Sequence, residues 1–139
     1  MNSESESKDI LEVLRAHELF LVVDAAGVRA DLRNAIHTGV VRNGANLGQA
    51  LMIGSDFKRS NFSETDLSCA VLASGNYDPA DFSRANLTHA NCRGASFKNA
   101  ELENAKLVHT NLSGADLRDV NFERAVLVDA DLFGVIFED

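Results

Sequence analysis

The chain of 139 residues has no tryptophan, one proline, one tyrosine and only two cysteines. Two cysteines are too few for a disulfide framework, so they favour a reduced, cytoplasmic setting. Basic residues are also scarce: 13 stand against 21 acidic ones, for a formal net charge of −8. This balance argues against the basic footprint of a nucleic-acid-binding domain and against a polybasic membrane patch. We therefore predict a cytoplasmic protein with no nucleic-acid or membrane partner.

Long apolar runs are missing as well, since none approaches the roughly 18 residues that a membrane-spanning helix needs. The polar, acidic start of the chain lacks the positive charge and apolar stretch of a secretory signal. We predict a disordered tail at residues 1–8. Apolar residues then recur at helical spacing from Asp9 to Leu21. They predict a short capping α-helix and linker at residues 9–29, followed by one repetitive domain at residues 30–139.

What the chain has in abundance is a period of five. An apolar residue stands at every fifth position from Leu47 to Phe137, and a small residue, most often alanine, comes two positions before nearly every one. This period fits neither an α-helix nor a flat strand; it is typical of a solenoid in which each repeat forms one side of a coil. The predicted core consists of Leu47, Met52, Phe57, Phe62, Leu67, Leu72, Tyr77, Phe82, Leu87, Cys92, Phe97, Leu102, Leu107, Leu112, Leu117, Phe122, Leu127, Leu132 and Phe137.

Four such sides make a roughly square coil of 20 residues, and coils stack about 4.8 Å apart, as strands do. The repeats from Leu32 to Phe137 amount to about 5.5 coils. Asp or Asn often precedes the large residue, where its side chain can bond to nearby backbone and support the turn. His37 and Arg42 occupy core positions in the first coil. Because burying an unpaired charge is costly, we expect a bulge between His37 and Gly44.

Three segments match one motif closely: Ala85-Asn86-Leu87, Ala115-Asp116-Leu117 and Ala130-Asp131-Leu132. They resemble the consensus A-[DN]-L-x-x of the pentapeptide-repeat family, and the resemblance covers roughly residues 30 to 139. It implies an all-β solenoid, namely a right-handed quadrilateral β-helix. The segment from His17 to Leu32 also looks like the helix and first coil that precede such repeats.

Stacking at intervals of 20 residues groups the outward positions into columns. On one side, an apolar patch is expected from Leu51, Ile53, Val71 and Ala73. Exposed apolar clusters often mark contact sites; cover by the N-terminal helix or a small loop is the alternative interpretation.

A column at one corner contains residue types that bind zinc: Cys69, His89, His109 and Asp129. Neighbours in this column are expected about 4.8 Å apart. A chance succession of corner residues is the simpler explanation of the column, so we predict no metal site there. Elsewhere the sequence has no phosphate-binding loop and no nucleophile with an evident base. We therefore predict a protein that is not an enzyme and has no cofactor.

Protein binding is the usual role of a solenoid, because it offers extended flat faces. We predict a scaffold or protein-interaction module. An uncovered last coil is an exposed edge, so we expect a homodimer through the C-terminal end or through the Leu51/Val71 patch. The alternative, implied by the family resemblance, is a DNA mimic that binds gyrase and protects it from quinolones. Charge does not favour it: residues 30–139 contain 15 acidic and 10 basic residues, whereas 26 Å of duplex shows about 15 phosphates.

Overall fold

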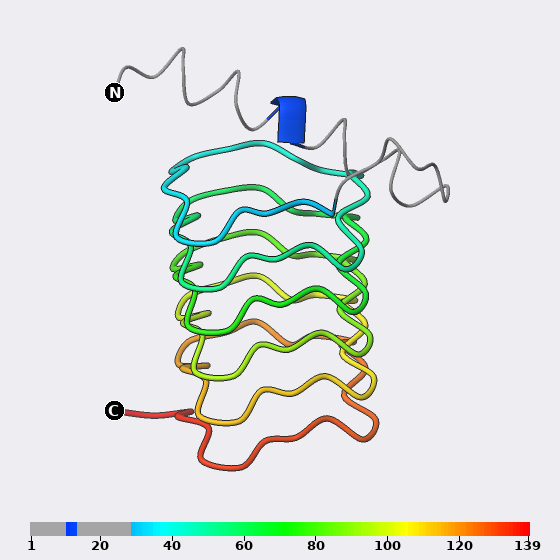
Figure 1. The fold of residues 1–139 in the computed structure, drawn as a ribbon. Coiled ribbons are helices and arrows are strands. Elements are labelled where there is room, and N and C mark those ends of the chain that lie inside the picture. The colour runs from blue at the N-terminus through cyan, green and yellow to red at the C-terminus, as the bar shows by residue number, and fades with distance from the viewer. Residues whose placement is uncertain (1–10, 14–28) are drawn as a thin grey trace.

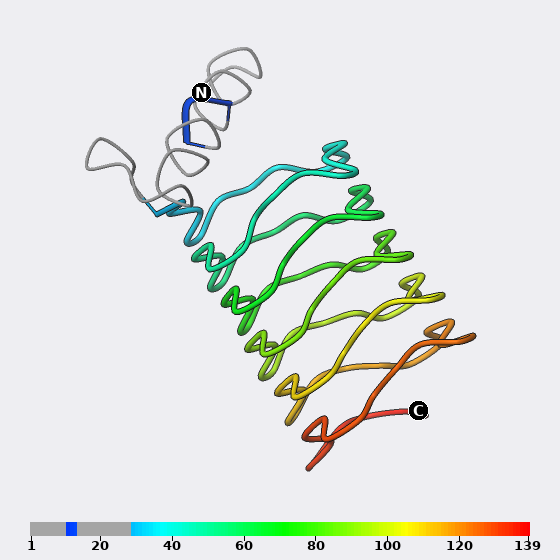
Figure 2. The same ribbon diagram turned by 90° about the vertical axis from the view of Figure 1, so that its right-hand side faces the viewer.

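The computed structural model describes residues 11–13 and 29–139. Figure 1 shows the chain winding into a stack of coils, with residues 11–13 at one end and the C-terminus at the other. Seen from the side, the coils follow one another along a slanted stack (Figure 2). The predicted tail at residues 1–8 lies outside the described residues, as does most of the predicted segment 9–29.

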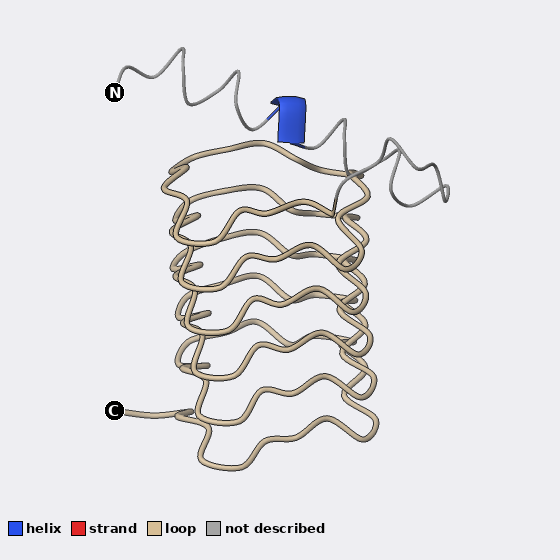
Figure 3. Cartoon of the chain, viewed as in Figure 1, coloured by secondary structure: helices blue, strands red, loops and turns tan. Residues whose placement is uncertain are grey.

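Each side of a coil is one pentapeptide: a bridging residue, a core residue, a two-residue turn and a small residue. Isolated parallel β-bridges join residue i to residue i+20, and 18 of them run without omission from Asp31–Leu51 to Asp116–Ile136. The five-residue register is therefore unbroken between residues 31 and 136. Because a turn follows every bridge, the described part of the chain forms no longer strand, and Figure 3 draws the coils as loops.

Neighbouring coils satisfy one another's backbone groups. At the side centred on Leu87, the Leu87 N–H donates to the Lys106 carbonyl at 2.7 Å, and the His89 N–H donates to the Val108 carbonyl at 3.0 Å. In return, the Lys106 N–H donates to the Ala85 carbonyl at 2.9 Å. The Ala90 N–H closes the turn on the Leu87 carbonyl at 2.9 Å. Buried backbone N–H and C=O groups need hydrogen-bond partners, and the neighbouring coils supply them here.

The predicted role of the Asp and Asn side chains is confirmed. The Asn86 Oδ1 accepts a hydrogen bond from the Thr88 N–H at 3.1 Å, just before the turn. The same bond to the residue two positions later forms at Asp31, Asn46, Asp56, Asn61, Asp66, Asn76, Asp81, Asn91, Asn111, Asp116, Asn121 and Asp131. The corner residue that follows adopts a positive φ in nearly every turn, for example 60° at His89.

The core lies on the axis of the stack. All predicted core residues from Leu47 to Leu117 are buried, with exposed fractions of 2% or less. Aromatic side chains gather in two adjacent columns: Phe62 stacks on Phe82 with ring centroids 5.2 Å apart, and Tyr77 stacks on Phe97 at 5.3 Å. Edge-to-face contacts join the two columns, as between Phe82 and Phe97 at 5.4 Å.

The predicted burial is wrong for the end of the register. Phe122 and Leu127 are only partly buried, while Leu132 is 39% and Phe137 is 51% exposed. These four residues occupy core positions of the five-residue register but belong to the last coil. No residue that the structure describes packs over the outer side of that coil.

The predicted bulge between His37 and Gly44 is also wrong. The bridges Ile36–Asp56 and Val41–Asn61 keep the first coil regular. The His37 ring lies over Phe57 with a centroid separation of 5.7 Å. Arg42 is half-buried at the end of the stack, where its Nη1 donates to the Val41 carbonyl at 2.7 Å. A side chain in an end coil is packed from one side only, so a charged group fits there without distorting the backbone.

Residues 11–13 form a helical turn near the first coil (Figure 1), and Val13 packs against the core. Among the described residues, no helix is long and apolar enough to cross a membrane.

Candidate interaction surfaces

The predicted apolar patch forms on one side of the stack. Leu51 and Val71 are joined by a parallel bridge, which places them next to each other on successive coils. Ile53 is 39% exposed, whereas Leu51, Val71 and Ala73 are partly buried. The structure therefore brings the four predicted residues together as a modest apolar surface.

An ion pair borders this patch toward the N-terminal end. The Arg33 guanidinium donates to both carboxylate oxygens of Asp31, at 2.8 and 2.7 Å. These hydrogen bonds, with the Arg33 N–H and charge, lower the pKa of Asp31 to about 2. On the C-terminal side of the patch, the next coil carries the exposed polar residues Asn91 and Arg93. The apolar surface thus has polar limits at both ends.

The structure places the residues of the corner column with zinc-binding types next to one another, as their spacing of 20 residues predicts. The rings of His89 and His109 stack with centroids 4.9 Å apart and an interplanar angle of 11°. The His109 Nδ1 lies 3.8 Å from the Asp129 Oδ2, and Cys69 is exposed one coil above His89. Within the part of the chain that the structure describes, no group of three or more such side chains is arranged to hold a metal ion.

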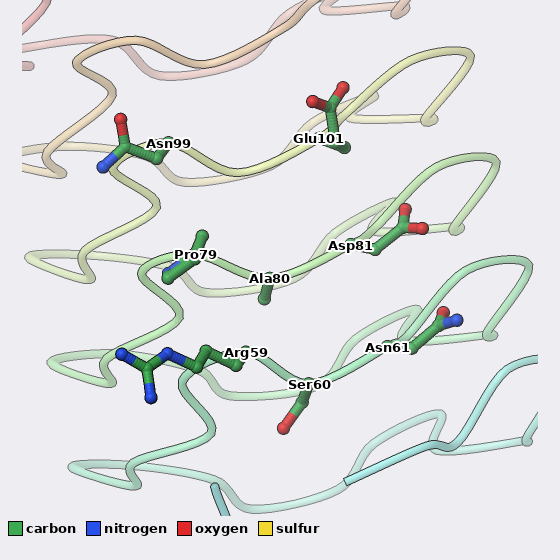
Figure 4. Close-up of a pocket in the computed structure, with 8 residues that line it drawn as sticks. All are labelled: Arg59, Ser60, Asn61, Pro79, Ala80, Asp81, Asn99 and Glu101. Atoms are coloured by element: carbon green, nitrogen blue, oxygen red, sulfur yellow. The ribbon is translucent and has the colours of Figure 1, made fainter. Parts of the chain in front are cut away.

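A shallow groove of about 330 Å³ runs along another corner (Figure 4). Its two edges are columns on three successive coils, with Arg59, Pro79 and Asn99 on one edge and Asn61, Asp81 and Glu101 on the other. Pro79 follows a cis peptide bond at a corner where Arg59 and Asn99 have a positive φ. The predicted sites did not include this groove, because its lining alternates polar types without a recognisable motif.

The potentially reactive side chains in the core are held in their neutral forms. Burial raises the pKa of the Cys92 thiol to about 12. Burial likewise raises the pKa of Tyr77, although its hydroxyl lies 3.2 Å from the Ser55 Oγ. Both groups are fully enclosed, so they serve packing rather than surface chemistry.

The described residues thus define a parallel β-solenoid that sets its polar groups in columns along flat outer faces. The chain belongs to the pentapeptide-repeat family, because the family model for pentapeptide repeats matches residues 43–75, 80–119 and 100–139 in 8 copies. No curated protein sequence matches the chain significantly.

Solved structures of the same family are similar to this fold. A pentapeptide-repeat protein from the thylakoid lumen of Arabidopsis thaliana is 27% identical, with a TM-score of 0.68 over 78% of this chain and 72% of that one. The pentapeptide-repeat protein Rfr23 from the cyanobacterium Cyanothece 51142 is 21% identical, with a TM-score of 0.49 over 92% and 99%. A trypsin-treated variant of QnrB1, a plasmid-mediated fluoroquinolone resistance protein, is 18% identical, with a TM-score of 0.45 over 78% and 65%. The family membership and the first of these structures identify the fold as a right-handed quadrilateral β-helix.

Proposed function

We propose that this protein is a non-enzymatic scaffold that binds a protein partner through the Leu51, Ile53, Val71 and Ala73 patch. One observation carries the proposal: the bridging position is occupied mostly by Asp or Asn along the stack, yet Leu51 and Val71 occupy it on two successive coils of one side. These two side chains give up the turn-supporting hydrogen bond that Asn91 and Asn111 make on the same side.

The reactive groups support a non-enzymatic role. Cys92 and Tyr77 are sealed in the core with raised pKa values. Cys69, His89 and His109 lie in one exposed column, where successive residues are held about one strand spacing apart. We also propose that the N-terminal segment caps the first coil, in keeping with the packing of Val13 against the core. We further propose a cytoplasmic location, on the basis of the amino-acid composition alone.

The test is affinity capture from the native host with the purified protein as bait. Leu51→Lys/Val71→Lys places two charges in the patch, and a bound partner is expected to be lost because apolar contact at the centre of an interface is replaced by charge. Asn91→Lys/Asn111→Lys is the matched control, since it adds the same charges one and two coils further along the same side. Partners retained equally by both variants would refute the proposal.

The gyrase-binding alternative receives no support from the described surface. The outer faces interleave charges of both signs, as in the Lys58–Asp56 pair at 3.5 Å and the Arg84–Glu64 pair at 3.8 Å. A duplex presents phosphates of one sign at regular spacing. We therefore expect no effect of micromolar protein on DNA supercoiling by gyrase, in the absence or presence of a quinolone. Inhibition or protection in that assay would revive the alternative.

A further inference from the structure

Two imidazole rings lie side by side at one corner of the stack, on successive coils. The rings of His89 and His109 are parallel within 11°, and their centroids are 4.9 Å apart. Both residues are exposed, and the side chain of His109 is 48% exposed. The corner therefore presents two nitrogen ligands at one place on the surface.

The backbone holds this pair in place. The His89 N–H donates to the Val108 carbonyl at 3.0 Å, and the His109 N–H donates to the Val128 carbonyl at 3.0 Å. The two histidines also share the same backbone conformation, with φ of 60° and 55°. Stacking of the coils thus determines how far apart the rings lie. A ligand that contacts both rings needs no rearrangement of the chain, which lowers the cost of binding.

A carboxylate stands beside the second ring. The Asp129 Oδ2 lies 3.8 Å from the His109 Nδ1. A carboxylate favours the tautomer with the proton on the nitrogen that faces it, and this leaves the lone pair of Nε2 free for a metal ion. Metal-binding histidines are commonly supported by a carboxylate in this way. Asp129 is thus placed to position the His109 ring.

Imidazole nitrogens bind zinc, nickel and copper ions. For tetrahedral zinc, with bonds of about 2.0–2.1 Å, the two nitrogens must come to about 3.3 Å from each other. The rings of His89 and His109 are 4.9 Å apart as they stand. Since both side chains are exposed, they can tilt toward each other by rotation about their side-chain bonds, without any movement of the coils.

We propose that His89 and His109 together bind one divalent transition-metal ion of the zinc, nickel or copper type, and that Asp129 positions His109 as a ligand. Among the described residues, no group of three protein ligands is arranged for a metal ion, so water completes the coordination. The spacing in the sequence favoured a chance succession at this corner; the parallel rings and the carboxylate at Nδ1 are what the structure adds. The site lies outside the apolar patch of the proposed function and does not depend on it.

Calorimetric titration of the chelator-treated full chain with zinc chloride tests the site. We expect one zinc ion per chain. His89→Asn and His109→Asn should each weaken binding by about 100-fold, because each removes one of the two ligands. Both variants should fold, since Asn99 and Asn104 already occupy corners with a positive φ. His37→Asn removes a histidine from elsewhere in the stack and should bind zinc as the wild type does.

Electron paramagnetic resonance with copper(II) identifies the ligands directly. The titration uses Cys69→Ser, because an exposed thiol reacts with copper(II), whereas Cys92 is buried. Hyperfine coupling to two imidazole nitrogens is expected in this background, and coupling to one after His89→Asn. Asp129→Asn should weaken zinc binding by only about tenfold and keep the two-nitrogen signal, and Asp129→Glu should restore most of the affinity.

Three results would overturn the proposal. Half an ion per chain would mean that the ion joins two molecules rather than two rings of one molecule. Unchanged zinc binding in both His89→Asn and His109→Asn would place the ion elsewhere, and loss of zinc binding in Cys69→Ser would make the thiolate a required ligand. Thermal unfolding without metal shows whether each variant is folded, so that a loss of binding can be assigned to the missing ligand.

Discussion

Ser55, Gly75 and Tyr77 form a set of residues that fit only together. The Tyr77 hydroxyl lies 3.2 Å from the Ser55 Oγ, and that Oγ donates to the Met52 carbonyl at 2.7 Å. Gly75 stands at the small-residue position next to this ring. A Cβ there would lie 2.6 Å from the Tyr77 Cε2 and 2.7 Å from its hydroxyl oxygen. Glycine in place of the usual alanine at position 75 therefore leaves room for the Tyr77 ring.

Gly75→Ala should accordingly destabilise the protein, although alanine is the commonest residue at this position of the repeat. We expect a loss of about 1–3 kcal/mol in the free energy of unfolding, which is typical of overpacking. Chemical denaturation measures it. Gly75→Ala/Tyr77→Leu should recover part of the loss, because Ala115 and Leu117 already form that pair in the same column. A Gly75→Ala variant as stable as the wild type would show that the ring can move.

Among the described residues, Arg42 has the side chain whose burial is least compensated by hydrogen bonds. Its Nε is buried without a hydrogen-bond partner, and desolvation lowers the pKa of the guanidinium. Every other described residue in its axial column is apolar, beginning with Phe62. Arg42→Leu should therefore stabilise the protein by about 1–3 kcal/mol, the cost of a buried unpaired polar group.

Urea denaturation of Arg42→Leu checks this value, with Arg84→Leu as the control. Arg84 lies at an exposed corner, so its replacement should change stability by less than about 0.5 kcal/mol. Destabilisation by Arg42→Leu would mean that the arginine makes a favourable contact that outweighs its desolvation.

At the scale of the pentapeptide, two Asp-x-Arg segments add a charge-assisted version of the turn-supporting bond. The Asp116 Oδ1 accepts from the Arg118 N–H at 3.1 Å and from its Nε at 2.9 Å, while the Oδ2 accepts from Nη2 at 2.7 Å. The side-chain hydrogen bond with Arg118 lowers the pKa of Asp116. Asp31 and Arg33 repeat this arrangement, but with side chains about half exposed.

A lowered pKa in the folded state predicts a loss of stability in acid. The contribution of Asp116 is present above the unfolded pKa of about 3.9 and disappears as the pH falls through the lower folded value. Asp116→Asn keeps the acceptor for the backbone N–H and removes the charge. It should cost about 1 kcal/mol at pH 7, and this cost should shrink as the pH falls through the folded-state pKa of Asp116. Unfolding curves across this range measure the difference. Asp31→Asn should show an effect in the same direction, because the pKa of Asp31 is lowered as well, and an equal loss at every pH would exclude an electrostatic origin.

The repeat explains why so much of this element was predictable. A five-residue period determines which side chain faces the axis, so Phe62, Leu87 and Leu107 are found where the pattern places them. The period does not indicate whether another coil covers that side chain, which is why Leu132 and Phe137 were misplaced. The bulge expected at Arg42 is absent for a related reason. That expectation assumed that coils on both sides would enclose the charged side chain.

The candidate surfaces likewise differ in how far the sequence predicts them. Spacing alone brings Leu51 next to Val71 and His89 next to His109. The groove between Arg59 and Asp81 was not predicted, because its lining residues share no recognisable motif. It emerges only from the folded backbone.

For the whole molecule, the decisive variable is the number of residues between stacked positions. Deleting residues 86–105 removes one complete coil and joins Ala85 to Lys106, which occupies the same position in its pentapeptide as Asn86. Every column stays in register. Because solenoid stability is roughly a sum over repeats and their interfaces, this variant should fold with a lower melting temperature and one cooperative transition.

Deleting residues 86–103 removes two residues fewer but shifts the register by two. The core positions that follow would then receive Ala105, Thr110 and Ala115, while Leu107, Leu112 and Leu117 would move to exposed corners. This variant should lose the structure of its C-terminal half despite keeping more of the sequence. Amide hydrogen exchange distinguishes the two deletions by the protection that remains after Ala85. Protection of that half in both variants would contradict a fold held together by stacking in register, because it would show that the coils tolerate side chains of the wrong size along the axis.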